Sequence, residues 1–171
     1  MSRKRRASGE APHKDNEVDQ RDPEADRYVR RHMRIGWWSL LVFVTLGLML
    51  ESMHGFKVQW YVSADNSTRR LMFTLAHAHG TLVSIVHLVF AAAIRVLGPA
   101  FHRFRRPSSW CLLLAGMLLP GGFFAGGAVI YEGDPGLGIL LVPVGGSLLV
   151  LATLLTALSV ESKRWSGHDE D

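Results

Sequence analysis

The chain has 171 residues, of which 48% are hydrophobic and 20% charged, and its formal net charge is +4. These averages are typical of a soluble domain, but residues 1–34 and 161–171 together hold 23 of the 34 charged residues. Residues 35–160 hold 73 apolar residues and eleven charged ones. This division excludes a soluble globular protein and predicts a membrane domain between two polar ends.

The N-terminal segment, residues 1–34, carries ten Lys or Arg, seven Asp or Glu and eight apolar residues. So few apolar side chains cannot offset the entropy of ordering the chain. We therefore expect a disordered, basic cytoplasmic tail, in which residues 25–34 could form a short helix beside the membrane. The basic cluster at residues 3–6 favours an electrostatic anchor on the membrane over a nucleic-acid patch, and no nucleic-acid partner is expected.

Long apolar runs divide the central region into helical spans. A hydrocarbon core of about 30 Å needs about 20 helical residues, and every run is long enough. A closed β-barrel cannot be built from so few runs, so the spans are helices. The sequence predicts an all-α integral membrane four-helix bundle with spans at residues 35–54, 70–97, 110–131 and 137–160.

The distribution of cations predicts how the bundle is oriented. Sixteen Lys or Arg fall on the side of the two termini and three on the opposite side. Because cytoplasmic segments are enriched in Lys and Arg, both termini, including the short tail 161–171, are expected in the cytoplasm. We expect a multi-pass protein of the inner-membrane type found in bacteria, with the lipid bilayer as its main partner.

The third span contains a GxxxG pair, Gly122 and Gly126. Such residues let two helix backbones approach closely in a membrane. The pair predicts close helix packing, which could serve within the chain, in a homo-oligomer or against a partner membrane subunit.

The second span carries three histidines, His77, His79 and His87. At 100° per residue, His77 lies on one stripe with small and hydroxyl residues that leads towards His87, while His79 lies about 200° from His77. On a regular helix, His77 and His79 therefore cannot point at one site.

Glu51 and His54 lie three residues apart near the end of the first span, so they share a helix face. The same spacing places a carboxylate and an imidazole on one metal in helical bundles. At about 1.5 Å per residue, both residues and His77 are expected in the outer half of the bundle, whereas His87 is expected closer to the cytoplasm.

Three interpretations of these groups remain open. In the first, Glu51, His54 and His77, with His79 and His87 as further candidates, bind haem or a transition metal. In the second, the polar stripe is a path for protons or a small solute. In the third, which we favour, the groups form polar contacts that hold helices together.

The sequence contains no nucleotide-binding loop, nucleophile elbow or zinc-protease motif, and we assign no catalytic residue. Its single cysteine, Cys111, cannot form an intrachain disulfide. We therefore predict a structural or accessory membrane component without catalysis of its own. The alternatives are a haem- or metal-binding redox protein and a proton or solute transporter.

Overall fold

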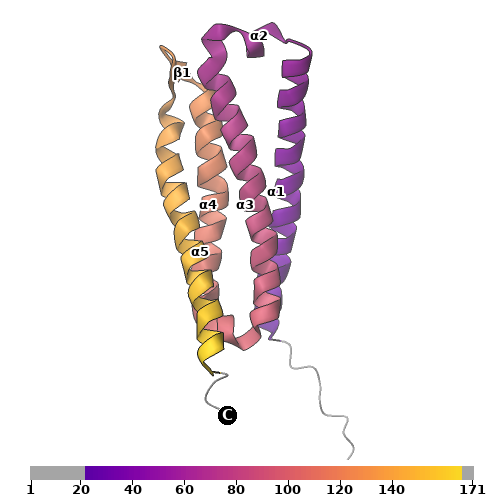
Figure 1. Ribbon diagram of the computed structural model, residues 1–171, viewed down its shortest axis with the longest axis vertical. Coiled ribbons are helices and arrows are strands. Elements are labelled where there is room, and N and C mark those ends of the chain that lie inside the picture. Colours follow the sequence, from indigo (N-terminus) through magenta and orange to yellow (C-terminus); the bar gives the residue numbers. More distant parts are fainter. Residues whose placement is uncertain (1–21, 167–171) are drawn as a thin grey trace, which may run out of the picture.

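The computed structural model describes residues 22–166, apart from the side chains of residues 99–100 and 162–166. Residues 1–21 of the predicted disordered tail and residues 167–171 lie outside the described residues. Within the described part, four helices are long and apolar enough to cross a membrane, which confirms the predicted all-α membrane fold. They are α1 (Pro23–Gly55), α3 (Ser67–Leu97), α4 (His102–Ala128) and α5 (Leu141–Ser166) (Figure 1).

Short elements connect the long helices. The first and second long helices are joined by α2 (Gln59–Val62) and the 3-10 turn η1 (Ala64–Asn66), and the next two by the turn η2 (Gly98–Phe101). Between α4 and α5 lie a hairpin, β1 (Ile130–Tyr131) and β2 (Asp134–Pro135), and the turn η3 (Leu137–Leu140). We call the end that holds η2 the inner end, following the predicted orientation, and the end that holds α2 and β1 the outer end (Figure 1).

The start of α1 differs from the predicted boundary between tail and membrane domain. The side chain of Asp22 accepts a hydrogen bond from the Glu24 backbone N–H at 2.9 Å, and Pro23 occupies the first helical position. An aspartate cap followed by proline is a favourable helix start. Residues 23–34 are therefore helical and continuous with the first span. At about 1.5 Å per residue, the 33 residues of α1 extend about 50 Å, which is longer than the hydrocarbon core.

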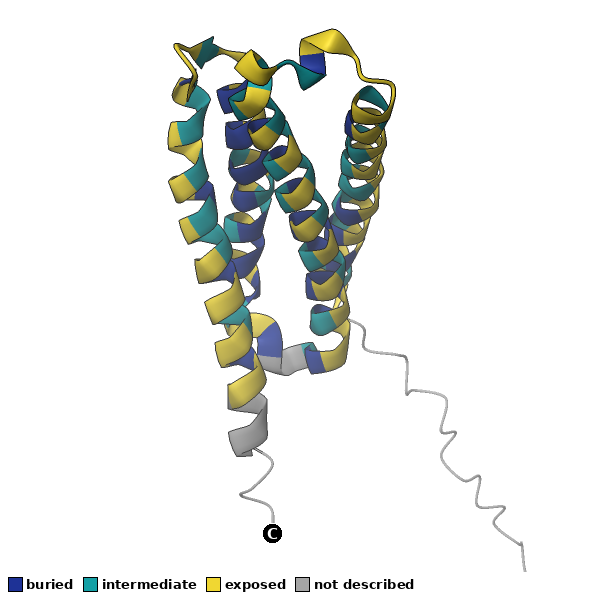
Figure 2. Ribbon diagram, turned by 45° about the horizontal axis from the view of Figure 1, so that its top comes forward, coloured by how far each residue is buried: buried dark blue, intermediate teal, exposed yellow. Residues whose placement is uncertain are grey.

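The long helices pack in the order α1, α3, α4, α5, each mainly against its neighbour (Figure 1). In the most apolar window of α3 and of α4, 44% of the residues are buried, against 11% in α1 and in the span that contains α5. Figure 2 shows exposed residues along most of α1 and α5. The bundle is thus an open row whose outer helices present broad apolar faces outward.

At the outer end, a tight hairpin leads the chain from α4 back to α5. Its two turn residues, Glu132 and Gly133, have φ values of 49° and 96°, as a type I′ turn requires. The chain then passes close to α4, where the backbone N–H of Gly136 donates to the carbonyl of Gly126 at 2.9 Å. This approach sets the start of α5 against the last turns of α4.

The GxxxG pair of α4 lies at this contact within the chain. A Cβ built on Gly122 would lie 3.0 Å from the carbonyl oxygen of Gly138, and one built on Gly126 would lie 3.4 Å from the backbone nitrogen of Ile139. Both glycines are buried. The face of α4 that carries Gly122 and Gly126 is therefore covered by η3 and α5. Of the three uses predicted for this pair, the structure shows packing within the chain.

Candidate functional site

A pair of buried histidines joins α1 to α3 near the inner end of the bundle. His32 of α1 is 0% exposed and His87 of α3 is 2% exposed. Their Nδ1 atoms lie 2.7 Å apart, and the rings stack with centroids separated by 4.9 Å. Because a hydrogen bond between two ring nitrogens needs one donor and one acceptor, one Nδ1 carries a proton and the other does not.

A serine and an arginine extend this pair. The Oγ of Ser109, on α4, lies 2.8 Å from His32 Nε2, and the guanidinium of Arg31 donates to the same Oγ. Arginine has donors and no acceptor, so the Ser109 hydroxyl accepts from Arg31; towards His32 Nε2 it either donates its own hydrogen or accepts a second one. We call the residues Arg31, Ser109, His32 and His87 the polar chain.

Two arrangements of the hydrogens fit these contacts, because each imidazole nitrogen can donate or accept. With Nε2 of His32 accepting from Ser109, the neutral ring carries its hydrogen on Nδ1 and donates to Nδ1 of His87. The neutral ring of His87 then carries its hydrogen on Nε2. In the reverse arrangement, His87 Nδ1 donates to His32 and His32 Nε2 donates to Ser109. In both, the polar chain links a cation on α1 to an imidazole on α3.

The far end of the polar chain meets an apolar groove. His87 lines a hollow of about 320 Å³ between α1, α3 and α4, together with Ile35, Phe43 and Met117. A Cβ built on Gly116 would lie 3.0 Å from His87 Nε2. The glycine at this position keeps α4 close to the histidine ring.

Two further polar contacts join α1 and α3 above the histidine pair. Ser39 donates to the carbonyl of Ile35, and the Ser84 hydroxyl shares its hydrogen between Ser39 Oγ at 2.8 Å and the carbonyl oxygen of Gly80 at 2.7 Å. Nearer the outer end, His77 Nδ1 lies 2.7 Å from the carbonyl oxygen of Phe43 and donates to it. Polar contacts thus join the two helices at three levels.

Glycine on α1 makes room for His77. A Cβ built on Gly47 would overlap the His77 ring. The backbone of α1 therefore passes directly over the ring, and the space a side chain would occupy at this position is filled by His77.

The predicted outer cluster is present as a surface hollow without a polar network. Glu51, His54 and His77 line this hollow of about 470 Å³ together with Arg70, and the side chains of Glu51 and His54 are exposed. No hydrogen bond or ion pair joins Glu51 to either histidine in residues 22–166. Among the described residues, no three His, Cys, Asp or Glu side chains are grouped so that they could hold a metal ion.

The three histidines of α3 face different neighbours. His79 Nδ1 lies 2.9 Å from the carbonyl oxygen of Leu75 in its own helix, and the His79 ring lies 4.8 Å from the ring of Phe123 on α4. His77 faces α1, so the expectation that His77 and His79 point at different surroundings is confirmed. His87 meets His32, a partner that the sequence analysis had placed in the tail.

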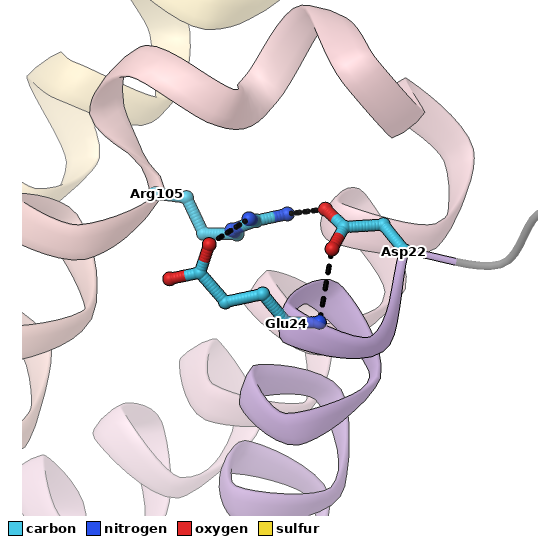
Figure 3. A network of polar contacts seen from close by, with 3 residues as sticks. All are labelled: Asp22, Glu24 and Arg105. Atoms are coloured by element: carbon cyan, nitrogen blue, oxygen red, sulfur yellow. Dashed lines mark hydrogen bonds and ion pairs between the residues drawn. The ribbon is translucent and has the colours of Figure 1, made fainter.

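A buried arginine closes the inner end of the bundle (Figure 3). Arg105 of α4, whose side chain is 3% exposed, forms ion pairs with Asp22 at 2.7 Å and with Glu24 at 3.1 Å. The hydrogen bond from Arg105 holds the pKa of the Asp22 carboxyl below its usual value of 3.8. One cation therefore joins the first turn of α1 to α4.

His32, Ser109 and this ion pair were not among the predicted site residues, because they lie outside the predicted spans. One local signal could have found the longer helix: Asp22, Pro23 and Glu24 form the pattern of cap, proline and acid that begins helices. Continuing the helical period through that segment would have placed His32 one turn before Gly36, which is also buried.

Comparison with known proteins leaves the chain without a match: no protein-family model, curated protein or solved structure matches it.

Proposed function

We propose that the protein is a structural or accessory component of a membrane, in which polar contacts hold α1 on the bundle. The observation that most supports this proposal is that three polar side chains of α3 meet partners on α1. His87 bonds to His32, Ser84 to Ser39, and His77 to a backbone carbonyl. These three contacts need no bound ligand to satisfy them.

Apolar packing alone holds α1 weakly. Few residues in its apolar window are buried, and lipid tails are as apolar as leucine side chains, so little hydrophobic force drives one helix onto another in a membrane. Polar contacts between membrane helices contribute about 0.6 kcal/mol on average and up to about 1.7 kcal/mol. Contacts at three levels therefore supply a large part of what holds α1 in place.

The test replaces one histidine that crosses the interface and one that does not. His87→Leu leaves buried His32 without its partner, which should lower the free energy of unfolding by about 1–3 kcal/mol. His79→Leu is the matched control, because His79 bonds to a carbonyl of its own helix and should cost less than about 1 kcal/mol. Unfolding in mixed micelles measures both, and equal losses would contradict the role of the interface.

Proton transfer is a second candidate, and one observation favours it. The polar chain links Arg31, which lines a hollow at the inner end, to His87, which lines the groove between α1, α3 and α4. Hydroxyl and imidazole groups bonded in series can pass a proton along. Towards the outer end, however, the ring of Phe43 packs directly on Gly80. This contact separates the groove from the hollow that Glu51, His54 and His77 line.

Proton flux distinguishes the two candidates. We expect liposomes that contain the protein and a trapped pH-sensitive dye to be no leakier to protons than protein-free liposomes. A flux that depends on the protein, disappears in Ser109→Ala and persists in His79→Leu would favour proton transfer and overturn the structural role.

A further inference from the structure

The inner end of α1 carries four arginines on one face. Arg27, Arg30, Arg31 and Arg34 are spaced three and four residues apart, which places them along one stripe of the helix. They line a hollow of about 700 Å³, which Arg106 and Trp110 of α4 close from the other side. We call this hollow the arginine pocket.

Within residues 22–166, no carboxylate neutralises the positive charge of the arginine pocket. None of its five arginines forms an ion pair within the described residues. The acidic residue in its lining, Glu24, bonds to Arg105, which lies outside the lining. Five guanidinium groups gathered around one hollow therefore favour an anion with several acceptor oxygens, such as a phosphate ester.

Arg31 holds a fixed position in this pocket. Its guanidinium carbon lies 5.1 Å from the centre of the Tyr28 ring and 5.7 Å from that of Trp110. It also donates to Ser109, while its buried Nε has no hydrogen-bond partner among the described residues. The aromatic rings and the serine orient this cation without using all of its donors.

An apolar groove lies about one helix turn further into the bundle than the arginine pocket. On α1, Ile35 lies four residues after Arg31, and on α4, Leu113 lies three residues after Trp110, so each continues the same helix face by one turn. Both residues line the groove of about 320 Å³, with Phe43 and Met117. The groove is lined by α1, α3 and α4, so it shares α1 and α4 with the arginine pocket.

We propose that the arginine pocket and this groove form a binding site for one anionic phospholipid of the inner leaflet. The phosphate of the headgroup binds the arginines of α1, and an acyl chain occupies the groove between α1 and α4. The order of the two parts matches a phospholipid, whose charged headgroup lies at the membrane surface and whose tails point inward. Basic pockets between membrane helices on the cytoplasmic side bind anionic headgroups in this way.

Two double variants test the proposal with the same change in charge. Arg30→Gln with Arg34→Gln removes two cations from the arginine pocket and leaves Arg31 and its bond to Ser109 intact. Arg95→Gln with Arg103→Gln removes two cations from the same end of the bundle, outside the pocket lining. Native mass spectrometry of the detergent-purified full chain, titrated with phosphatidylglycerol or with phosphatidylcholine, measures the bound lipid.

We expect the wild-type chain to retain phosphatidylglycerol in preference to phosphatidylcholine. The pocket variant should bind phosphatidylglycerol about thirtyfold more weakly than the control variant, because each of the two basic residues removed contributes on the order of 1 kcal/mol near an anionic headgroup. Equal weakening in the two variants would mean general attraction to the membrane surface and would overturn the proposal. Circular dichroism checks that both variants remain helical.

A soluble headgroup separates a lipid site from a free phosphate site. Glycerol phosphate, which lacks acyl chains, should raise the thermal unfolding temperature much less than phosphatidylglycerol at the same concentration. Met117→Trp narrows the groove at a residue that is 73% exposed, so it should weaken binding of the lipid and not of glycerol phosphate. Equal stabilisation by the two ligands would show a free phosphate site and contradict the lipid assignment.

Discussion

His32 and His87 share one hydrogen bond between their Nδ1 atoms, 2.7 Å apart, inside the bundle. The bond requires that one Nδ1 carries a hydrogen and the other does not. Neither residue can therefore be replaced by an apolar one without leaving the other with an unpaired ring nitrogen. The stability of α1 on the bundle consequently depends on the pair rather than on either histidine alone.

A double-mutant cycle should reveal this dependence. His32→Leu and His87→Leu are each expected to destabilise the protein by about 1–3 kcal/mol, because each leaves one buried imidazole unsatisfied. The double variant should lose less than the sum of the two, since an apolar pair leaves no polar group behind. Unfolding of all four proteins in mixed micelles gives the coupling energy, and strict additivity would mean that the two rings do not stabilise one another.

The four membrane helices could be predicted because hydropathy is a local property of the chain. Each span needed a long apolar run and no knowledge of its neighbours. The ion pairs that join the first turn of α1 to Arg105 are different, because they connect residues 81 and 83 positions apart in the sequence. Contacts at such separations cannot be inferred from local composition.

The candidate site could be predicted in part. Helical geometry separated His77 from His79, and polar contacts between the first two spans were expected. The expected partners were Glu51 and His54, whereas the structure places His77 against a backbone carbonyl and His87 against His32. Helix spacing shows which face a residue occupies, but the tilt and register of the neighbouring helix decide which atoms meet across it.

The ion pair between Asp22 and Arg105 predicts a pH-dependent contribution to stability. The folded-state pKa of Asp22 lies below its unfolded value of 3.8, so the carboxylate stabilises the folded state above that value. This stabilisation is lost as the pH falls through the lower folded-state pKa. Asp22→Asn keeps a good helix cap and removes the charge, so it should lower the unfolding temperature at pH 7 and have little effect at pH 2.

The comparison uses thermal unfolding of wild type and Asp22→Asn in the same detergent between pH 2 and pH 7. The difference between the two proteins should narrow as the pH falls. A difference that stays constant over this range would mean that the charge of Asp22 does not contribute. Asp65→Asn, in the η1 turn at the other end of the bundle, controls for a general effect of net charge.

The distribution of cations predicts that the inner end faces the cytoplasm. Single cysteines in a Cys111→Ser background test this. Asp134→Cys in the β2 strand and Arg103→Cys near the start of α4 lie at exposed positions, at opposite ends of the bundle (Figure 1). A membrane-impermeant maleimide added to intact cells should label the first and not the second, until the membrane is opened. Labelling of Arg103→Cys alone would reverse the predicted orientation.

Two neighbouring glycines of α4 should respond in opposite ways to the same substitution. A Cβ on Gly122 would lie 3.0 Å from the carbonyl oxygen of Gly138, whereas a Cβ on Gly121 meets nothing within 4 Å. Gly122→Ala should therefore push α5 away from α4 and destabilise the protein by about 1–3 kcal/mol. Gly121→Ala should stabilise it by about 0.5–1 kcal/mol, because alanine loses less conformational freedom in a helix. Unfolding in mixed micelles measures both, and a loss of stability in both variants would mean that α4 needs flexibility here rather than a close approach to α5.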